Sequence, residues 1–403
     1  MSKPRILPFG TWESPIGADA LARSGVRLGF PSFDREGSLF WVETRPAEQG
    51  RSVLVQRASD GTFHDLTPAS LSVRSRVHEY GGMSYLIFGS EFFVVNFSDQ
   101  QIWRVAGNSA PTPLTSAPEF RFAEMSMDAA RRRLIAVGER HGTAREPQNL
   151  IVIIELSSGK VGALVTGRDF YAAPALSPDG KELAFLAWDH PHMPWDAAEL
   201  WVADLDSGGS VQGMQHIAGG PEGSAFQPGW SNAGLLYFSL EVDGFWNLHR
   251  WMDQRVTRVM DLSAELGAPL WQLGTRVWDF HGKDTVGACF RNGLSELLRF
   301  HSDGQIESIS RDWAHVGQLA CSGDYLALIV GWAGGGSELA LLNLATGKAE
   351  TVRNAYLGLL LPEDTSVAEA VTFPTGDGEL AHGFFYAPRN HGFAGPDGAR
   401  PPL

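Results

Sequence analysis

Acidic and aromatic residues in three loop-like segments are the strongest candidates for chemistry in this chain. The candidates are Glu79, Tyr80, Asp189, Trp195, Asp243 and Trp246. A carboxylate that is shielded from water binds an ammonium group well, through charge-assisted hydrogen bonds. These residue types therefore indicate a site for a ligand with a free amino group, on which the aromatic rings would pack.

Each of the three segments also has a purely structural interpretation. Glu79 precedes two glycines, so it could cap a turn in a connection whose glycines adopt positive φ. Residues 189–196 contain two histidines near carboxylates, but the prolines and the lack of a further well-spaced ligand argue against a metal site. This loop is either self-packed or a rigid aromatic lip. Most surface acids are merely solvated, and most of the 13 tryptophans are expected to pack between sheets.

The composition limits the class of function. The chain has 403 residues, a formal net charge of −14 and no basic cluster, which argues against nucleic acids and anionic membranes as partners. Cys289 and Cys321 lie in apolar, strand-like runs and are expected to be buried thiols. No signal peptide is visible and no apolar run is long enough to cross a bilayer, so a cytoplasmic protein is expected. No metal or other cofactor is predicted.

Two kinds of turn alternate along the chain between short apolar runs. One is typified by Ser-Pro-Asp-Gly at residues 177–180, and the other by Asp-Ser-Gly at residues 206–208. Turns of the first kind recur roughly every 40 to 55 residues, the period of a four-stranded propeller blade. This spacing predicts an all-β fold, a seven-bladed β-propeller, and argues against a pair of β-sandwiches. The predicted blades are residues 27–67, 82–116, 120–166, 170–219, 225–263, 272–310 and 314–354.

Strand direction predicts which face of the propeller carries function. In an antiparallel blade, the loops between the second and third strands share a face with the connections between blades. The long, irregular loops are of this kind and include residues 138–149 and 189–198. Function concentrates on loops held by a rigid scaffold, so this loop face is the predicted functional face. Each blade supplies its own four strands, so we expect the ring to close by side-chain packing.

Several motifs resemble the prolyl oligopeptidase family of serine peptidases, in particular its dipeptidyl-peptidase and acylaminoacyl-peptidase-like branch. They are Arg-Val-His-Glu-Tyr-Gly-Gly at residues 76–82, Trp-Asp-His-Pro-His-Met-Pro-Trp-Asp at residues 188–196, Gly-Phe-Trp-Asn-Leu at residues 244–248 and the stretch 369–388. The resemblance spans essentially the whole chain. It implies a propeller that admits short peptides to a following α/β-hydrolase domain, where a serine attacks with a histidine as general base.

The family's catalytic motifs do not occur in these 403 residues. No Gly-x-Ser-x-Gly nucleophile elbow is found, so no catalytic residue is assigned. Residues 369–388 read as strand, Gly-Asp-Gly turn and strand, which is typical of the first hairpin of the hydrolase domain. We therefore expect a lead-in (1–26), a propeller (27–356), and a linker with an orphan hairpin (357–403). The resemblance implies the gating portion of an exopeptidase, truncated and catalytically silent as it stands.

Two other classes of function stay open at this point. A non-enzymatic, TolB-like binding propeller would have a signal peptide and no terminal hairpin, whereas the sequence shows the reverse. A stand-alone propeller enzyme would need histidines and carboxylates that converge at the inner strand ends, and the sequence shows no such regular set.

Overall fold

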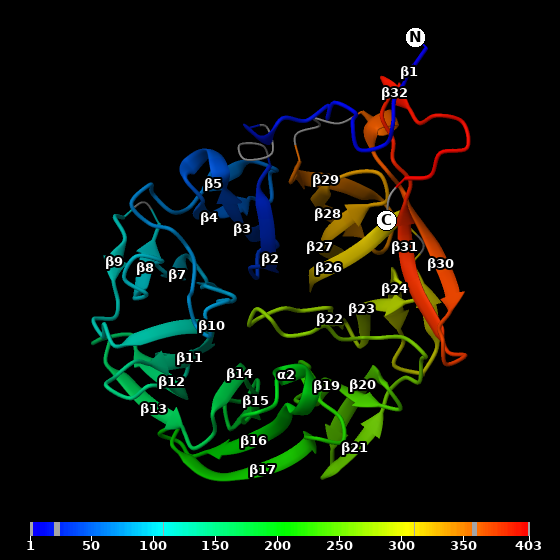
Figure 1. Ribbon diagram of the computed structural model, residues 1–403. Coiled ribbons are helices and arrows are strands. Elements are labelled where there is room, and N and C mark those ends of the chain that lie inside the picture. The colour runs from blue at the N-terminus through cyan, green and yellow to red at the C-terminus, as the bar shows by residue number, and fades with distance from the viewer. Residues whose placement is uncertain (1–2, 20–24, 108, 310, 357–360, 402–403) are drawn as a thin grey trace.

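Seven four-stranded antiparallel sheets form a ring in the computed structural model, which describes residues 3–19, 25–107, 109–309, 311–356 and 361–401. Figure 1 shows the sheets arranged radially around a common centre, as the blades of a β-propeller. The predicted seven-bladed fold is therefore confirmed. Each of the seven blades lies inside its predicted span to within one residue.

The strands of each blade follow one another from the centre of the ring outward (Figure 1). Blades 1 to 4 consist of β2 (Arg27–Phe33), β3 (Leu39–Arg45), β4 (Arg51–Arg57) and β5 (Phe63–Asp65); β6 (Tyr85–Phe88), β7 (Glu91–Val95), β8 (Ile102–Ala106) and β9 (Thr112–Pro113); β10 (Phe120–Asp128), β11 (Arg133–Arg140), β12 (Gln148–Glu155) and β13 (Val161–Val165); and β14 (Phe170–Leu176), β15 (Glu182–Trp188), β16 (Glu199–Leu205) and β17 (Val211–Gly219). Blades 5 to 7 consist of β18 (Ala225–Trp230), β19 (Leu236–Val242), β20 (Phe245–Met252) and β21 (Arg255–Arg258); β22 (Trp278–His281), β23 (Asp284–Arg291), β24 (Leu294–Phe300) and β25 (Ile306–Ser308); and β26 (Trp313–Ser322), β27 (Tyr325–Trp332), β28 (Ser337–Asn343) and β29 (Ala349–Asn354).

Helix is nearly absent from the described residues. The short helical segments are η1 (Pro46–Glu48), α2 (Pro194–Ala197) and η2 (Pro362–Asp364). No helix in this part of the chain is both long and apolar enough to cross a membrane.

The two faces of the ring differ as strand direction predicts. Strand β15 begins after the turn at residues 177–180 and ends before the loop at residues 189–198, so these segments lie on opposite faces. Residues from all seven blades, mainly those of the first turns, surround a cavity of about 1010 Å³ at the centre of one face. We call this side the turn face, and the opposite side is the loop face.

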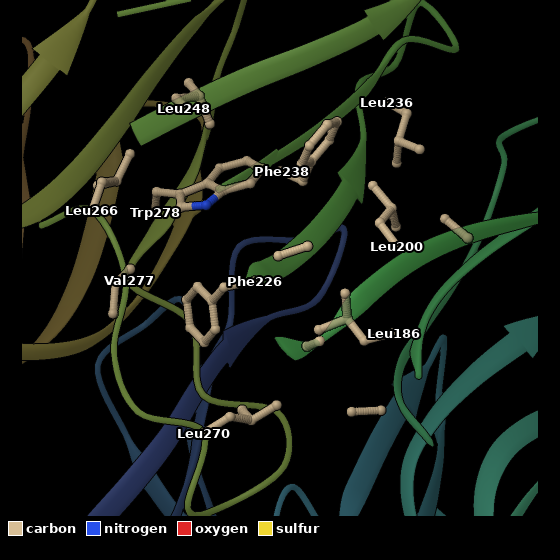
Figure 2. Close-up of a cluster of buried hydrophobic side chains, with 14 of the residues drawn as sticks. Leu186, Leu200, Phe226, Leu236, Phe238, Leu248, Leu266, Leu270, Val277 and Trp278 are labelled. Carbon is tan, nitrogen blue, oxygen red and sulfur yellow. The ribbon is translucent and has the colours of Figure 1, made fainter. Parts of the chain in front are cut away.

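Neighbouring blades bury the broad faces of their sheets against one another. In the largest cluster, Trp278, Phe226 and Phe238 are each at most 2% exposed, and they pack near Leu186 and Leu200 of blade 4 (Figure 2). Because neighbouring blades cover both faces of an inner strand, such a strand is a nearly continuous run of apolar residues in the sequence. The blades therefore act as one packed scaffold that holds the loops.

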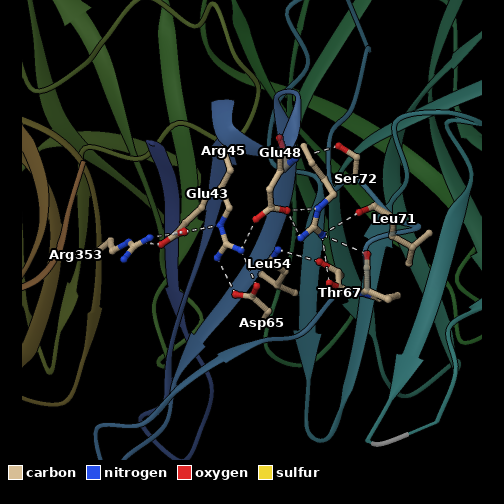
Figure 3. Close-up of polar contacts among 12 residues, drawn as sticks. Glu43, Arg45, Glu48, Leu54, Asp65, Thr67, Leu71, Ser72 and Arg353 are labelled. Carbon is tan, nitrogen blue, oxygen red and sulfur yellow. Dashed lines mark hydrogen bonds and ion pairs between the residues drawn. The ribbon is translucent and has the colours of Figure 1, made fainter. Parts of the chain in front are cut away.

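Blades 1 and 7 meet through side chains while remaining separate sheets. Trp41 of β3 packs with Leu339 of β28. Next to this contact, the carboxylate of Glu43, only 1% exposed, accepts hydrogen bonds from Arg353 of blade 7 at 3.2 Å and from Arg45 at 2.9 Å (Figure 3). The prediction that the ring closes by side-chain packing is thus confirmed.

Two small sheets lie outside the ring. Strands β30 (Ala368–Pro374) and β31 (Leu380–Tyr386) form the antiparallel hairpin that the sequence predicted, beside blade 6 (Figure 1). Strand β1 (Arg5–Ile6) pairs in parallel with β32 (Phe393–Ala394). The hairpin approaches the ring closely at Gly293, where an added Cβ would lie 2.3 Å from the Phe384 ring.

We expect this hairpin to be the least stable described part of the chain. Phe373 and Tyr386 are 53% and 58% exposed, and an isolated two-stranded hairpin is only marginally stable in water. Limited proteolysis should therefore cut near residues 362–367 or 389–400 and leave a resistant core of about residues 25–355. Equal resistance of the hairpin and the blades would contradict this expectation.

Candidate functional site

A cavity of about 560 Å³ lies on the loop face between blades 3 and 4. Its wall comes from the connection into blade 2, the long loop of blade 3 and the two segments that flank β14 and β15. The chemically relevant lining residues are His78, Glu79, Glu139, His141, Asn149, Arg168, Asp169 and His190. One of the six candidates from the sequence, Glu79, is therefore part of this wall.

Glu79 presents an exposed, ionised carboxylate to the cavity. Its side chain is 69% exposed, and one oxygen accepts a hydrogen bond from Arg121 at 2.6 Å. This hydrogen bond holds the pKa of the Glu79 carboxyl below its usual value. The backbone is also unusual, because His78 and Glu79 have φ values of 52° and 64°, in the left-handed region. Such conformations are strained in residues other than glycine and cluster at functional sites.

A buried carboxylate beneath Glu79 holds this bend in place. Glu139 of β11 is 2% exposed and accepts the backbone N–H of His78 at 2.6 Å. It also pairs with His141 and lies 3.3 Å from Arg121. Arg121 thus lies between two carboxylates, Glu79 and Glu139, one outside and one inside the wall.

Asp189 organises the opposite wall without lining the cavity itself. Its two oxygens accept hydrogen bonds from Arg168 at 2.6 Å and from the backbone N–H of Asp169 at 2.7 Å. Asp169 then accepts hydrogen bonds from the backbone and ring of His190, which lower the pKa of the Asp169 carboxyl. Among the described residues there is no group of three or more His, Cys, Asp and Glu side chains that could hold a metal ion.

An aromatic cluster brings two of the predicted segments together. The ring of Trp271 lies 5.0 Å from that of Tyr80 and 4.6 Å from that of Trp195, between ring centroids. Tyr80 and Trp271 are 57% and 47% exposed, so the cluster presents an apolar patch on the loop face. It lies at the inner end of the predicted lip, since α2 is near the centre of the ring (Figure 1).

The two candidates from blade 5 lie apart from the cavity. Asp243 occupies the turn between β19 and β20, with its side chain 81% exposed and 3.6 Å from Arg258. Trp246 is partly buried, donates its indole N–H to the backbone oxygen of Ser224 at 2.9 Å, and covers Gly267 so closely that a Cβ there would clash. These contacts are those of a residue that packs inside the protein. They therefore fit the structural interpretation of Trp246 and not a role in binding a ligand.

Sequence reasoning missed Trp271 and the buried partners of Glu79. The turn spacing predicts that the sixth blade begins at residue 272, but its first strand, β22, begins only at Trp278. The signal that could have found Trp271 is the length of the connection between β21 and β22, which, like that between β5 and β6, is much longer than the other connections between blades. Glu139 and Arg121 gave no signal, since both occupy ordinary strand positions.

The ring is similar to the propellers of solved peptidases. The chain is a seven-bladed propeller of the kind carried by peptidases of the prolyl oligopeptidase family, as the sequence motifs predicted. No protein-family model matches the chain, and no curated protein matches it in sequence. The comparison with solved structures is what supports this assignment.

Two solved peptidases show the similarity in detail. A Mycobacterium tuberculosis puromycin-hydrolysing peptidase is 29% identical, with a TM-score of 0.91 over 98% of this chain and 64% of that chain. A puromycin hydrolase mutant complexed with PGG is 27% identical, with the same TM-score and coverage. The chain therefore spans less than two thirds of the length of these relatives. Prolyl oligopeptidase B from Galerina marginata, at 15% identity and a TM-score of 0.65, shares the fold.

Proposed function

We propose that this chain is the substrate-gating propeller portion of a serine exopeptidase that cleaves short peptides. The observation that carries the proposal is the match over 98% of the chain to 64% of a puromycin-hydrolysing peptidase. The remaining part of such a protein would supply the α/β-hydrolase domain and its catalytic serine. The 403 residues contain no Gly-x-Ser-x-Gly motif, so the proposal includes catalytic silence of the chain alone.

The loop face is the side on which the catalytic domain would lie. Strand β29 ends on this face, and the chain then continues to the hairpin β30–β31. Exposed apolar residues on the hairpin, such as Phe373 and Leu380, would be covered by a hydrolase sheet. In this proposal, the ring and the docked domain would together admit short peptides and exclude folded proteins.

Within this arrangement, Glu79 is the residue that would hold the amino terminus of a peptide. It is exposed, ionised and placed on a strained bend in a cavity large enough for a few peptide atoms. Asp169 adds a second carboxylate on the opposite wall of the cavity. A protonated amine would bind between them by charge-assisted hydrogen bonds, while the neighbouring patch of Tyr80, Trp195 and Trp271 would contact apolar side chains.

The test is a nuclear magnetic resonance titration of the chain with a short peptide, with a free or an acetylated amino terminus. The free peptide should bind more tightly, and Glu79→Gln should weaken it about fivefold, which corresponds to about 1 kcal/mol for an exposed ion pair. Asp243→Asn is the matched control, since Asp243 is also an exposed carboxylate beside an arginine but lies outside the cavity. Equal affinity for the two peptides, or equal effects of the two substitutions, would contradict the role of Glu79.

A further inference from the structure

The connection between blades 5 and 6 reaches across the centre of the ring. Residues 269–275, here called the plug, contact residues 80–83, which lead into blade 2. Leu273 donates its backbone N–H to the oxygen of Gly81 at 3.1 Å and accepts that of Met83 at 2.8 Å. Figure 1 shows the chain before β22 extending to the centre of the ring. Both segments are connections between blades, so they meet on the loop face.

The sequence is adapted to this close approach. A Cβ on Gly82 would lie 2.4 Å from the backbone oxygen of Leu273. A Cβ on Gly274 would lie 2.5 Å from the Cβ of Met83, and Gly274 has a φ of +82°. Side chains at either glycine would push the two segments apart. Beneath the plug lies an inner cavity of about 370 Å³, lined by Leu270, Gly274 and Thr275 of this segment. This cavity shares lining residues with the large cavity of the turn face.

A single buried carboxylate ties the plug to two blades. Glu124 of β10 accepts the backbone N–H of Ala173 in blade 4 at 2.7 Å, and its side chain lies against Gly274 in the plug, where an added Cβ would be 3.5 Å from the Glu124 Cγ. Its own N–H donates to the oxygen of Met83 at 2.9 Å. Glu124 therefore contacts the plug, the segment that leads into blade 2, and the inner strand of blade 4.

No charged partner compensates this carboxylate. The plug, the segment 81–84 and β14 carry no charged side chain. The charged residues that share the inner cavity, Arg276 and Asp279, pair with each other at 2.8 Å. On β10 itself, Arg121 is engaged by Glu79, and Asp128 pairs with Arg133 at 2.9 Å. Burial accordingly raises the pKa of Glu124 to about 7.

Other blades use an uncharged residue for the same task. Inner strands β10 and β18 bulge at equivalent positions, and blade 5 has Gln227 where blade 3 has Glu124. Gln227 accepts the N–H of Val277 at 2.7 Å, across the seam to blade 6. Gln318, in the bulge of β26, accepts that of Phe30 at 2.5 Å, across the seam to blade 1. A protonated Glu124 matches these glutamines in shape and charge, and an ionised one does not.

We propose that Glu124 is a proton-dependent latch on the plug. When protonated, it holds the plug across the centre of the ring. When ionised, it favours an open plug, which joins the central cavities to the loop face. Opening hydrates the carboxyl, whose pKa then returns from about 7 toward its ordinary value of 4.5. The closed form thus binds the proton more tightly, so opening rises as pH increases from 4.5 to 7 and levels off above pH 7. The latch deepens the proposed gating function, because it would control a second entrance for small peptides.

Hydrogen–deuterium exchange of the plug across pH tests this latch. At each pH, exchange of peptides covering residues 266–275 is compared between the natural chain and Glu124→Gln, so that the intrinsic exchange rate cancels. The ratio of natural to variant rates should rise roughly 50-fold from pH 5 to pH 8, as the two pKa values require. A ratio that stays constant, or falls with pH, would overturn the proposal.

Two further measurements keep the test decisive. If Glu124→Gln does not fold, the exchange rate of the Leu273 amide is compared within the natural chain with that of the Val277 amide, which Gln227 holds. The ratio of the two rates should show the same 50-fold change with pH. A constant ratio would contradict the latch. Gln227→Glu should confer a similar pH dependence on Val277. The peptide titration with Glu79→Gln at fixed pH is independent of the latch, so failure of one leaves the other interpretable.

Discussion

Replacing Glu43 with alanine is expected to lower the free energy of unfolding by about 3 kcal/mol, because it removes a buried carboxylate that accepts hydrogen bonds from two arginine side chains. Glu43 is 1% exposed and joins blade 1 to Arg353 of blade 7. It also accepts the indole N–H of Trp41 at 3.1 Å, which alanine would leave without this partner. The chain has no shared sheet at this seam, so the loss would weaken the closure of the whole ring.

A second ion pair across the same seam provides the control. Glu350 lies 2.8 Å from Arg57, but its side chain is 55% exposed. Glu350→Ala should therefore change the free energy of unfolding by less than about 1 kcal/mol. Urea denaturation followed by circular dichroism measures both variants. Equal losses in the two would show that the buried network does not hold the ring closed.

Replacing Trp278 with alanine should cost about 4 kcal/mol of stability, the typical loss for a buried tryptophan. This residue is 1% exposed, fills the space between blades 5 and 6, and donates its indole N–H to Ser239 at 3.2 Å (Figure 2). Alanine leaves a cavity that the rigid blades cannot close and removes the donor to Ser239, whose hydroxyl keeps its own hydrogen bond to the Leu266 oxygen. The same denaturation experiment measures the change.

Trp271→Ala is the matched control, from the connection that leads to Trp278. Trp271 is 47% exposed on the loop face, so its loss should cost less than about 1 kcal/mol. Peptide affinity should respond in the opposite order, since Trp271 belongs to the proposed binding surface. A larger loss of stability at Trp271 than at Trp278 would contradict the described packing.

The blades were predictable from sequence because their signals are local. The residues of a turn such as Ser177–Gly180 specify that turn by themselves. The Ser177 hydroxyl donates to Asp179 at 2.8 Å, and Gly180 has a φ of +70°. Repeated at even spacing, such turns fix both the number of strands and the faces on which the loops lie. The terminal hairpin followed from the same kind of signal.

The site was less predictable because its geometry is not local. Residues 272–275 look like the start of a strand, but they pair with residues 80–83, nearly two hundred positions earlier. This contact places Trp271 beside Tyr80, which the sequence alone does not indicate. Trp246 and Asp243 resembled Trp195 and Asp189 in type, yet Gly267 gives Trp246 a place to pack and Asp243 stays in solvent.

Our central proposal is that these residues are the propeller of a serine peptidase whose nucleophile lies outside them. The most direct measurement is peptide mapping of the fluorophosphonate adduct formed by the natural protein that carries this sequence, alongside the purified 403-residue chain. We predict a labelled serine outside residues 1–403 in the natural protein. We also predict that the chain alone is unlabelled and does not hydrolyse aminoacyl or dipeptidyl amides. A labelled serine within these residues, or a natural protein without any labelled serine, would contradict the account.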